Sequence, residues 1–198
     1  MRRQIIVQED RGNGSDKHLL KFHRTFCETQ FRASKLAEDF NKKLLSVPAL
    51  ARTSPRISFL ECSVYVVKDL NQGRMAVLVE KQLDPTKYKK WNGNNGFVDG
   101  QDRSNGPVDN KDQTLLDIIE ESSEDEDEED QIRDDVAVPM LTPLELQRDI
   151  PQAFSCFTYR HTNRRMLVCD LQGVLDTSRS PTVFELTDPV IHYQSRSG

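Results

Sequence analysis

The chain has 198 residues, of which 36% are hydrophobic and 30% charged, so a core is expected over part of its length only. No run of about 18 apolar residues occurs, and the N-terminal apolar run is three residues long, so we expect neither a membrane-spanning helix nor a secretion signal. The expected location is cytoplasmic, with no membrane and no nucleic acid as partner. The net charge of −5 is unevenly placed: residues 117–135 hold twelve acidic residues and one arginine, a net −11, which leaves +6 for the rest.

The four cysteines are Cys27, Cys62, Cys156 and Cys169, and none belongs to a C-x-x-C pair. Without a secretion signal, the expectation is four reduced thiols that are mostly buried.

The N-terminal part of the chain divides into an irregular start and a helix. Residues 1–18 are polar with two glycines, which predicts a flexible N-terminus. From Leu19 to about Leu45, apolar residues recur at three- and four-residue steps, which predicts an amphipathic helix. The helix is expected to end before Pro48.

Two β-rich runs follow, Ile57–Val67 and Met75–Leu83, on either side of the turn residues Asn71-Gln72-Gly73. This pattern predicts an antiparallel hairpin. The next stretch, Asp84–Gly100, is dense in asparagine and glycine and is expected to be a loop. Its lysines and asparagines offer many donors, so it is either a phosphate-facing loop or a plain surface connection.

Residues 99–138 are polar and then strongly acidic, which predicts a disordered insertion. The last part, residues 139–198, begins with "TPLE", the pattern of a capped helix start. The sequence "AFSCFTYRHTNRRMLVCDLQGV" then predicts a strand or short helix, a turn at "HTNRR", and a strand that bears Asp170 near its end. The predicted class is therefore α+β.

Three polar residues stand out in the apolar last part: Asp170, Gln172 and Asp188. A buried, unpaired carboxylate costs several kcal/mol, so Asp170 requires a partner or a purpose. Carboxylate and amide oxygens are ligands that Mg²⁺ takes, together with nucleotide phosphates. From spacing alone, a metal site and ordinary surface acids both remain open.

The motifs "VEKQL", "YKKWNGNNGFV", "AFSCFTY", "LVCDLQGV" and "LTDPVIH" occur in this order. Together with the helix "CETQFRASKLAEDFN", they resemble the alpha-kinase family of atypical protein kinases, over residues 20–98 and 139–193. The resemblance implies a two-lobed kinase-like α+β domain with antiparallel hairpins and one long N-lobe helix. On this basis residues 19–98 are expected to be part of the N-lobe and hinge, and residues 139–198 part of the C-lobe.

The resemblance also implies roles for individual residues. Asp170 would be the catalytic carboxylate, and Gln172 and Asp188 would hold Mg²⁺. The implied reaction is phosphoryl transfer from ATP to serine or threonine of a protein substrate. The remaining implied residues bind ATP: Glu80 and Gln82 on the hinge, mainly through backbone groups, and Lys90 and Asn94 near the phosphates.

Two departures from the family pattern bear on activity. The family's nucleotide lysine precedes the long helix, where "RQIIVQED" has none, and Lys17 and Lys21 are poor substitutes. The family's zinc site also lacks its C-terminal ligands here, and Cys156 stands where the family has a histidine, so zinc is not expected. We therefore expect a catalytic domain that is incomplete at both ends. The alternatives are a pseudokinase or nucleotide-binding scaffold with an acidic interaction segment, and an acidic interaction protein in which the motifs are coincidental.

Overall fold

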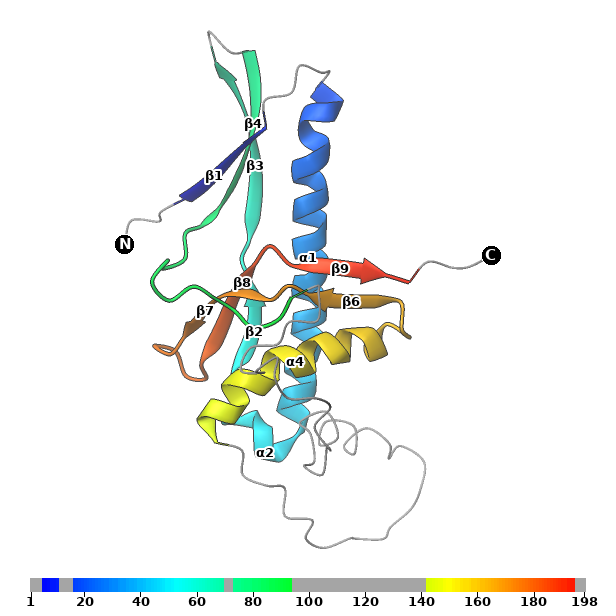
Figure 1. Cartoon of the computed structure of the whole chain (residues 1–198), viewed down its shortest axis with the longest axis vertical. Helices are drawn as coiled ribbons and strands as arrows, with labels where there is room; N and C mark the ends of the chain where they lie inside the picture. Colours follow the sequence, from blue (N-terminus) through cyan, green and yellow to red (C-terminus); the bar gives the residue numbers. More distant parts are fainter. Residues whose placement is uncertain (1–4, 11–15, 70–72, 94–141, 195–198) are drawn as a thin grey trace, which may run out of the picture.

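The structure is a computed structural model that describes residues 5–10, 16–69, 73–93 and 142–194. It is an elongated α+β molecule with one long helix beside a sheet at one end and a mixed body at the other (Figure 1). The predicted acidic insertion, residues 99–138, lies outside the described residues. Among the described helices, none is long and apolar enough to cross a lipid bilayer. The helices are α1 (Asp16–Ser46), α2 (Pro48–Ala51) and α4 (Pro143–His161), and the strands are β1 (Ile5–Asp10), β2 (Arg56–Phe59), β3 (Cys62–Asp69), β4 (Gly73–Lys81), β5 (Lys89–Lys90), β6 (Met166–Cys169), β7 (Gln172–Asp176), β8 (Val183–Thr187) and β9 (Val190–Tyr193).

The first sheet has the order β1-β4-β3 and is antiparallel throughout. The β3–β4 hairpin confirms the predicted turn between two β-rich runs. The prediction of a flexible segment over residues 1–18 is wrong for Ile5–Asp10, because this segment pairs with Ala76–Lys81 on the open side of β4. The polar composition gave no sign of β1, because its partner strand β4 lies some seventy residues away in the sequence.

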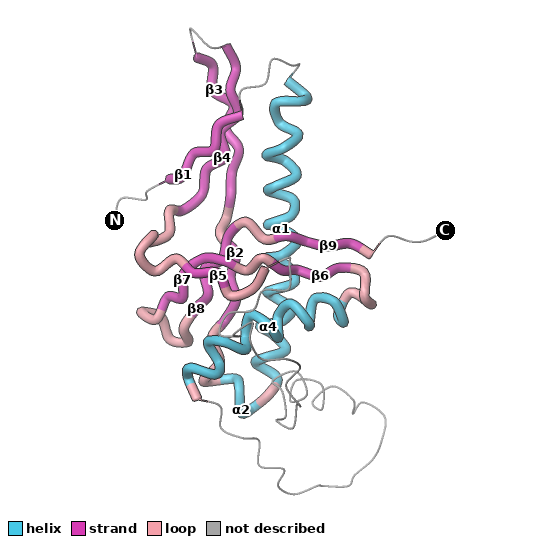
Figure 2. Tube along the Cα trace, in the orientation of Figure 1, coloured by secondary structure: helices cyan, strands magenta, loops and turns pink. Residues whose placement is uncertain are grey.

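The predicted single strand Ile57–Val67 is also wrong, because it is two strands in two different sheets. β2 pairs in parallel with β8 in a sheet of order β2-β8-β7-β5, whereas β3 belongs to the first sheet (Figure 2). The chain passes between the sheets at Leu60, whose backbone N–H donates to the carbonyl oxygen of Leu186 at 2.8 Å. A further pair, β6 with β9, is antiparallel.

Helix α1 confirms the predicted amphipathic helix, with one more turn at its N-terminus than expected. The resemblance implied a helix confined to the N-lobe, but α1 is shared by both ends of the molecule. It runs along the first sheet and continues to the other end, where it packs on β2 and α4 (Figure 1). Phe40 of α1 packs against Phe154 and Phe157 of α4, with ring centroids 5.5 and 5.3 Å apart. This aromatic contact anchors the C-terminal half of the chain to the long helix.

Helix α4 begins with the predicted capping box. Glu145 N–H donates to Thr142 Oγ1 at 3.3 Å, and Thr142 N–H donates to Glu145 Oε2 at 2.7 Å. Of the two alternatives predicted for "AFSCFTY", a strand or a short helix, the helix is confirmed, and it is longer than expected because it is part of α4, which continues through Pro151 to His161. The predicted turn at "HTNRR" is confirmed, with Asn163 and Arg164 in the left-handed conformation.

All four cysteines are free thiols. The expectation that they are mostly buried is wrong: Cys169 is buried, Cys27 and Cys62 are half-buried, and Cys156 is exposed.

Candidate active site

Asp170 lies in the turn between β6 and β7, at a strand end as predicted. Its φ of 61° is left-handed, a conformation that aspartate tolerates better than most residues. The next residue, Leu171, is fully buried and fixes the turn on the core. Two residues later, Gly173 has φ 152°, and a Cβ there would lie 2.0 Å from the carbonyl oxygen of Glu185. Only glycine therefore fits where β7 passes β8.

The carboxylate of Asp170 has a partner, the ammonium of Lys90 on β5. Asp170 Oδ1 is buried and accepts no hydrogen bond from the described residues, so this ion pair supplies its compensating charge. Strand β5 pairs with β7, and Lys90 lies directly opposite Gln172. The Lys90 side chain is 42% exposed, so an incoming anion can reach its ammonium.

Asp188 follows β8 directly and, like Asp170, has a left-handed backbone, with φ 50°. Its backbone N–H donates to Oε1 of Gln30 on α1 at 3.1 Å. Asp188 reaches the surface, but its carboxyl group is partly desolvated by the surrounding protein, and this raises its pKa. The charge of Asp170 raises the pKa further, whereas the charge of Lys90 lowers it. The two acids and the lysine therefore form one electrostatic cluster.

Glu80 on β4 adds a third acid to this cluster. Its two carboxylate oxygens each lie 2.9 Å from Oγ1 of Thr187, and Gln30 Nε2 donates to it at 3.4 Å. Burial raises the pKa of Glu80, the hydrogen bonds from Thr187 and Gln30 partly offset this, and Asp188 adds to the rise. Gln30 thus bridges Glu80 and the backbone of Asp188.

Tyr88 faces the same cluster, and the sequence reasoning missed it. Burial raises the pKa of its phenol, and the charges of Asp188, Glu80 and Asp170 raise it further. Its position among the lysines of "TKYKKW" was the available signal, because a tyrosine in a donor-rich loop can itself donate a hydrogen bond to a ligand.

Asn92 is the second residue that the sequence reasoning missed. It is 5% exposed, and its Nδ2 donates to Gln152 Oε1 at 3.1 Å and to Ser155 Oγ at 2.9 Å, both on α4. Its Oδ1 accepts from the backbone N–H of Leu171 at 3.0 Å. Asn92 therefore ties α4 to the residue next to Asp170.

The sequence matches the profile of the alpha-kinase family over residues 2–116 and 142–198. The chain belongs to the alpha-kinase family. The match extends beyond the resemblance found from the motifs alone, and the unmatched residues 117–141 include the acidic block.

Alpha-kinase relatives include myosin heavy chain kinase B of Dictyostelium discoideum, which is 46% identical over 46 residues, 23% of this chain and 5% of that protein. The structure resembles that of an alpha kinase from Entamoeba histolytica (TM-score 0.54, 19% identity, 98% of this chain and 57% of the other). It also resembles the inactive alpha-kinase domain of myosin-II heavy chain kinase A complexed with ATP (TM-score 0.50, 22% identity, 91% of this chain and 47% of the other). The chain spans about half the length of these structures, and at these identities they show the alpha-kinase fold.

The alpha-kinase motifs thus converge in space. Asp170, Asp188, Lys90 and Glu80 act on one another through ion pairing or charge, although they come from four separate segments. Gln172 lies at the same place, since β7 places it between Lys90 and Thr187.

Two of the residues predicted to bind the nucleotide are less well defined. Gln82 is half-buried and follows β4 directly, where the resemblance implies the hinge. Asn94 lies outside the described residues. Both roles stay predictions.

Of the zinc ligands that the resemblance implies, the structure shows only the position of Cys156, which stands where the family has a histidine. Cys156 lies on α4 and is exposed. Within the described ranges, no group of three or more His, Cys, Asp or Glu side chains is arranged to hold a metal ion. The Mg²⁺ ligands implied by the resemblance, Gln172 and Asp188, are one amide and one carboxylate, and their role stays a prediction.

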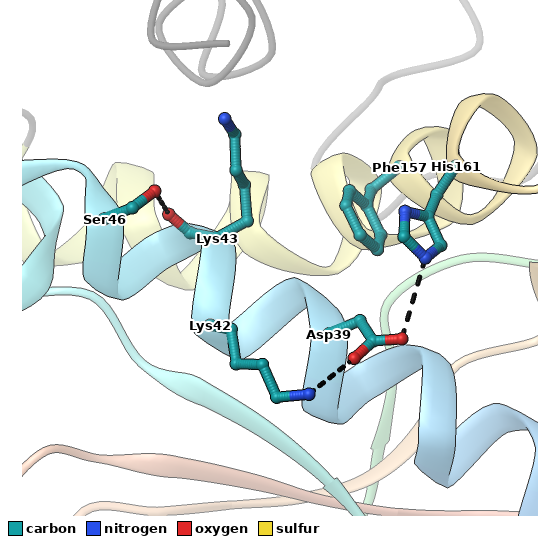
Figure 3. A pocket seen from close by; sticks show the side chains of 6 residues that line it. All are labelled: Asp39, Lys42, Lys43, Ser46, Phe157 and His161. Carbon is teal, nitrogen blue, oxygen red and sulfur yellow. Dashed lines mark hydrogen bonds and ion pairs between the residues drawn. The ribbon is translucent and has the colours of Figure 1, made fainter. Parts of the chain in front are cut away.

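A separate hollow of about 450 Å³ lies between α1 and α4 (Figure 3). Its acid, Asp39, pairs with Lys42 Nζ at 2.8 Å and lies 3.6 Å from Nε2 of His161, which stacks on Phe157. None of the residues predicted for catalysis lines this hollow. The hollow is therefore separate from the cluster of Asp170, Asp188, Glu80 and Lys90.

Proposed function

We propose that the protein transfers the γ-phosphoryl group of ATP to serine or threonine hydroxyls of a protein substrate. The observation that carries this proposal is the ion pair of Asp170 with Lys90 beside Asp188, in a chain of the alpha-kinase family. A carboxylate for the acceptor proton and a cation for the phosphates are the two groups that phosphoryl transfer requires from a protein.

Asp170 is proposed to accept the proton of the acceptor hydroxyl. The backbone after its left-handed turn is fixed by the burial of Leu171 and by the close approach of Gly173 to β8, so the carboxylate has a fixed place. A fixed acceptor avoids reorganisation during the reaction. Lys90 balances the charge of Asp170 before nucleotide arrives, and its exposed ammonium is proposed to bind the phosphates when they reach the site.

The donor set fits Mg²⁺. Gln172 supplies an amide oxygen and Asp188 a carboxylate oxygen, and the strand pairing brings Gln172 opposite Thr187, the residue before Asp188. Mg²⁺ is usually held by one or two carboxylates together with substrate phosphates. Bound there, it would neutralise phosphate charge. The roles of Glu80, Gln82 and Asn94 in holding ATP belong to the same proposal, as does the protein substrate.

The test is incorporation of labelled phosphate from ATP into a serine/threonine substrate, with ATP binding measured by titration calorimetry in Mg²⁺. Asp170→Asn is expected to abolish incorporation while the protein still binds ATP. The matched control is Asp176→Asn, the same change at the far end of β7, which is expected to retain incorporation. Equal incorporation by Asp170→Asn and the unsubstituted chain would refute the role of Asp170.

One observation favours a second function, nucleotide binding without transfer. The resemblance places a nucleotide lysine on a strand before the long helix, and β1 (Ile5–Asp10), which precedes α1 here, contains no lysine. Binding of Mg-ATP together with no incorporation into any serine/threonine substrate would support this second function. Absence of ATP binding would contradict both.

A further inference from the structure

Two thiols that the proposed reaction does not use approach each other between α1 and β3. Cys27 lies on α1 and Cys62 is the first residue of β3, and their sulfur atoms are 3.1 Å apart although the residues are 35 positions apart in the sequence. Both side chains are half-buried, so a small oxidant can reach them. A disulfide bond requires the sulfurs to approach to about 2.05 Å.

We propose that Cys27 and Cys62 are an oxidative modification site, at which hydrogen peroxide closes a disulfide between α1 and β3. The sulfur of Cys27, as thiolate, attacks one peroxide oxygen, and the O–O bond breaks to give a sulfenic acid and hydroxide. The proton lost by the thiol converts the hydroxide to water. The sulfur of Cys62 then attacks the sulfenic sulfur, the S–O bond breaks, and the Cys62 proton leaves with the hydroxyl as a second water. The two thiols lose two electrons, and peroxide is reduced to two waters.

The surroundings of the pair support this order of steps. Burial, the hydrogen bond to Cys27 and the charge of Glu80 raise the pKa of Cys62 to about 12, so Cys62 is a thiol at neutral pH. A thiol of this kind is a poor first nucleophile toward peroxide. It is nevertheless held against Cys27, where it can resolve a sulfenic acid before further oxidation.

The crosslink would lie beside the candidate active site without contacting its reacting atoms. Cys27 is three residues before Gln30 on α1, so both side chains lie on one face of the helix. Cys62 lies directly opposite Glu80 across the β3–β4 ladder. A disulfide at this point therefore fixes α1 and β3 next to the two residues that hold Asp188 and Thr187.

The experiment treats the purified full chain with hydrogen peroxide or with dithiothreitol, followed by alkylation, intact mass measurement and peptide mapping. The expected result is a mass lower by two hydrogen atoms and one linked peptide pair containing Cys27 and Cys62. Cys27→Ser and Cys62→Ser are each expected to lose the link. Cys156→Ser, which removes the exposed thiol, is the matched control and is expected to keep it.

A second measurement asks whether the native fold accommodates the bond. Closing a loop of this length is expected to raise Tm by roughly 10 °C between the reduced and the oxidised chain, and Cys27→Ser is expected to show no such rise. Links that involve Cys156, peroxide products at Cys27 without a link, or an unchanged or lower Tm in the linked protein would each overturn the proposal. These readouts do not depend on ATP, so failure of the proposed kinase function leaves them unaffected.

Discussion

The contacts of Asn92 predict that a single buried amide holds the Asp170 turn in place. In Asn92→Leu, a side chain of similar size replaces a 5% exposed amide that makes three hydrogen bonds. Most of the lost stability comes from the backbone N–H of Leu171, which is left buried without a hydrogen-bond acceptor.

The expected magnitude follows from these contacts. An unpaired buried donor costs about 1–3 kcal/mol, and each lost hydrogen bond of ordinary strength costs about 1 kcal/mol. The partners on α4 are side chains that can find other donors, so we expect a loss of about 3 kcal/mol in the free energy of unfolding. That is a large part of the roughly 5–15 kcal/mol of a typical domain.

Urea unfolding measures this loss. With a slope of about 2 kcal/mol/M, the midpoint is expected to fall by about 1.5 M. The chain has one tryptophan, Trp91, which is 3% exposed and adjacent to Asn92, so its fluorescence follows this region, and far-UV circular dichroism checks that the whole chain unfolds with it.

The control is Ser155→Ala, which removes one partner of the amide and leaves the bond to Leu171. It is expected to cost about 1 kcal/mol. The reasoning is refuted if Asn92→Leu unfolds within about 0.5 kcal/mol of the unsubstituted chain, or if Ser155→Ala costs as much as Asn92→Leu.

Three further changes test the site. Gly173→Ala is expected to lower the free energy of unfolding by at least about 3 kcal/mol, measured by urea unfolding, because its Cβ would meet the carbonyl oxygen of Glu185. Since burial raises the pKa of Glu80, its contribution to stability falls as the pH rises from the ordinary value of 4.5 through the raised value. Glu80→Gln is therefore expected to gain stability relative to the unsubstituted chain over that pH interval, measured by urea unfolding at successive pH values. Lys90→Met is expected to raise the pKa of Asp188, measured by NMR titration of the carboxyl carbon, because the ammonium lowers that pKa.

Each of these expectations has a contradicting outcome. An unchanged urea midpoint in Gly173→Ala would mean that β7 and β8 can separate at no cost. Parallel stability curves for Glu80→Gln and the unsubstituted chain would show that Glu80 titrates alike in the folded and unfolded states. For Lys90, the matched control is Lys89→Met, the neighbouring change on β5, which is expected to leave the titration of Asp188 in place, and a lower pKa of Asp188 in Lys90→Met would contradict the cluster.

The elements that could be predicted from the sequence are those with a strong local signal. Helix α1 carries a long apolar stripe, and α4 begins with a complete capping box at Thr142. The division between β2 and β3 carries no such signal, because Leu60 and Glu61 interrupt the β-rich run with neither glycine nor proline. What separates the two strands is the hydrogen bond of Leu60 to β8, a contact with a segment more than a hundred residues later.

The same limit applies to "AFSCFTY". Its aromatic and β-branched residues fit a strand as well as a helix by propensity. Burial decides the outcome, because Ala153, Phe154 and Thr158 lie on the buried face of α4, and Phe154 packs on Phe40. A tertiary contact thus overrides a weak local preference.

The candidate site divides in a similar way. Asp170, Gln172 and Asp188 could be named from the sequence because acids and amides at strand ends are chemically conspicuous. Asn92 could not be distinguished from the other asparagines of its loop, and its role depends on α4 and the Asp170 turn meeting the loop in space.

The acids of the site are positioned by neutral amides. Asn92 bonds the N–H next to Asp170, and Gln30 bonds the N–H of Asp188 while it also donates to Glu80. An amide donates and accepts at once and carries no charge, so it can fix a carboxylate-bearing turn without altering the charge of the cluster. A lysine or aspartate in either place would add to the mutual pKa shifts of the acids. With the turns held by amides, the proposed function leaves one contact of the cluster to change when a phosphate arrives, the pairing of Lys90 with Asp170.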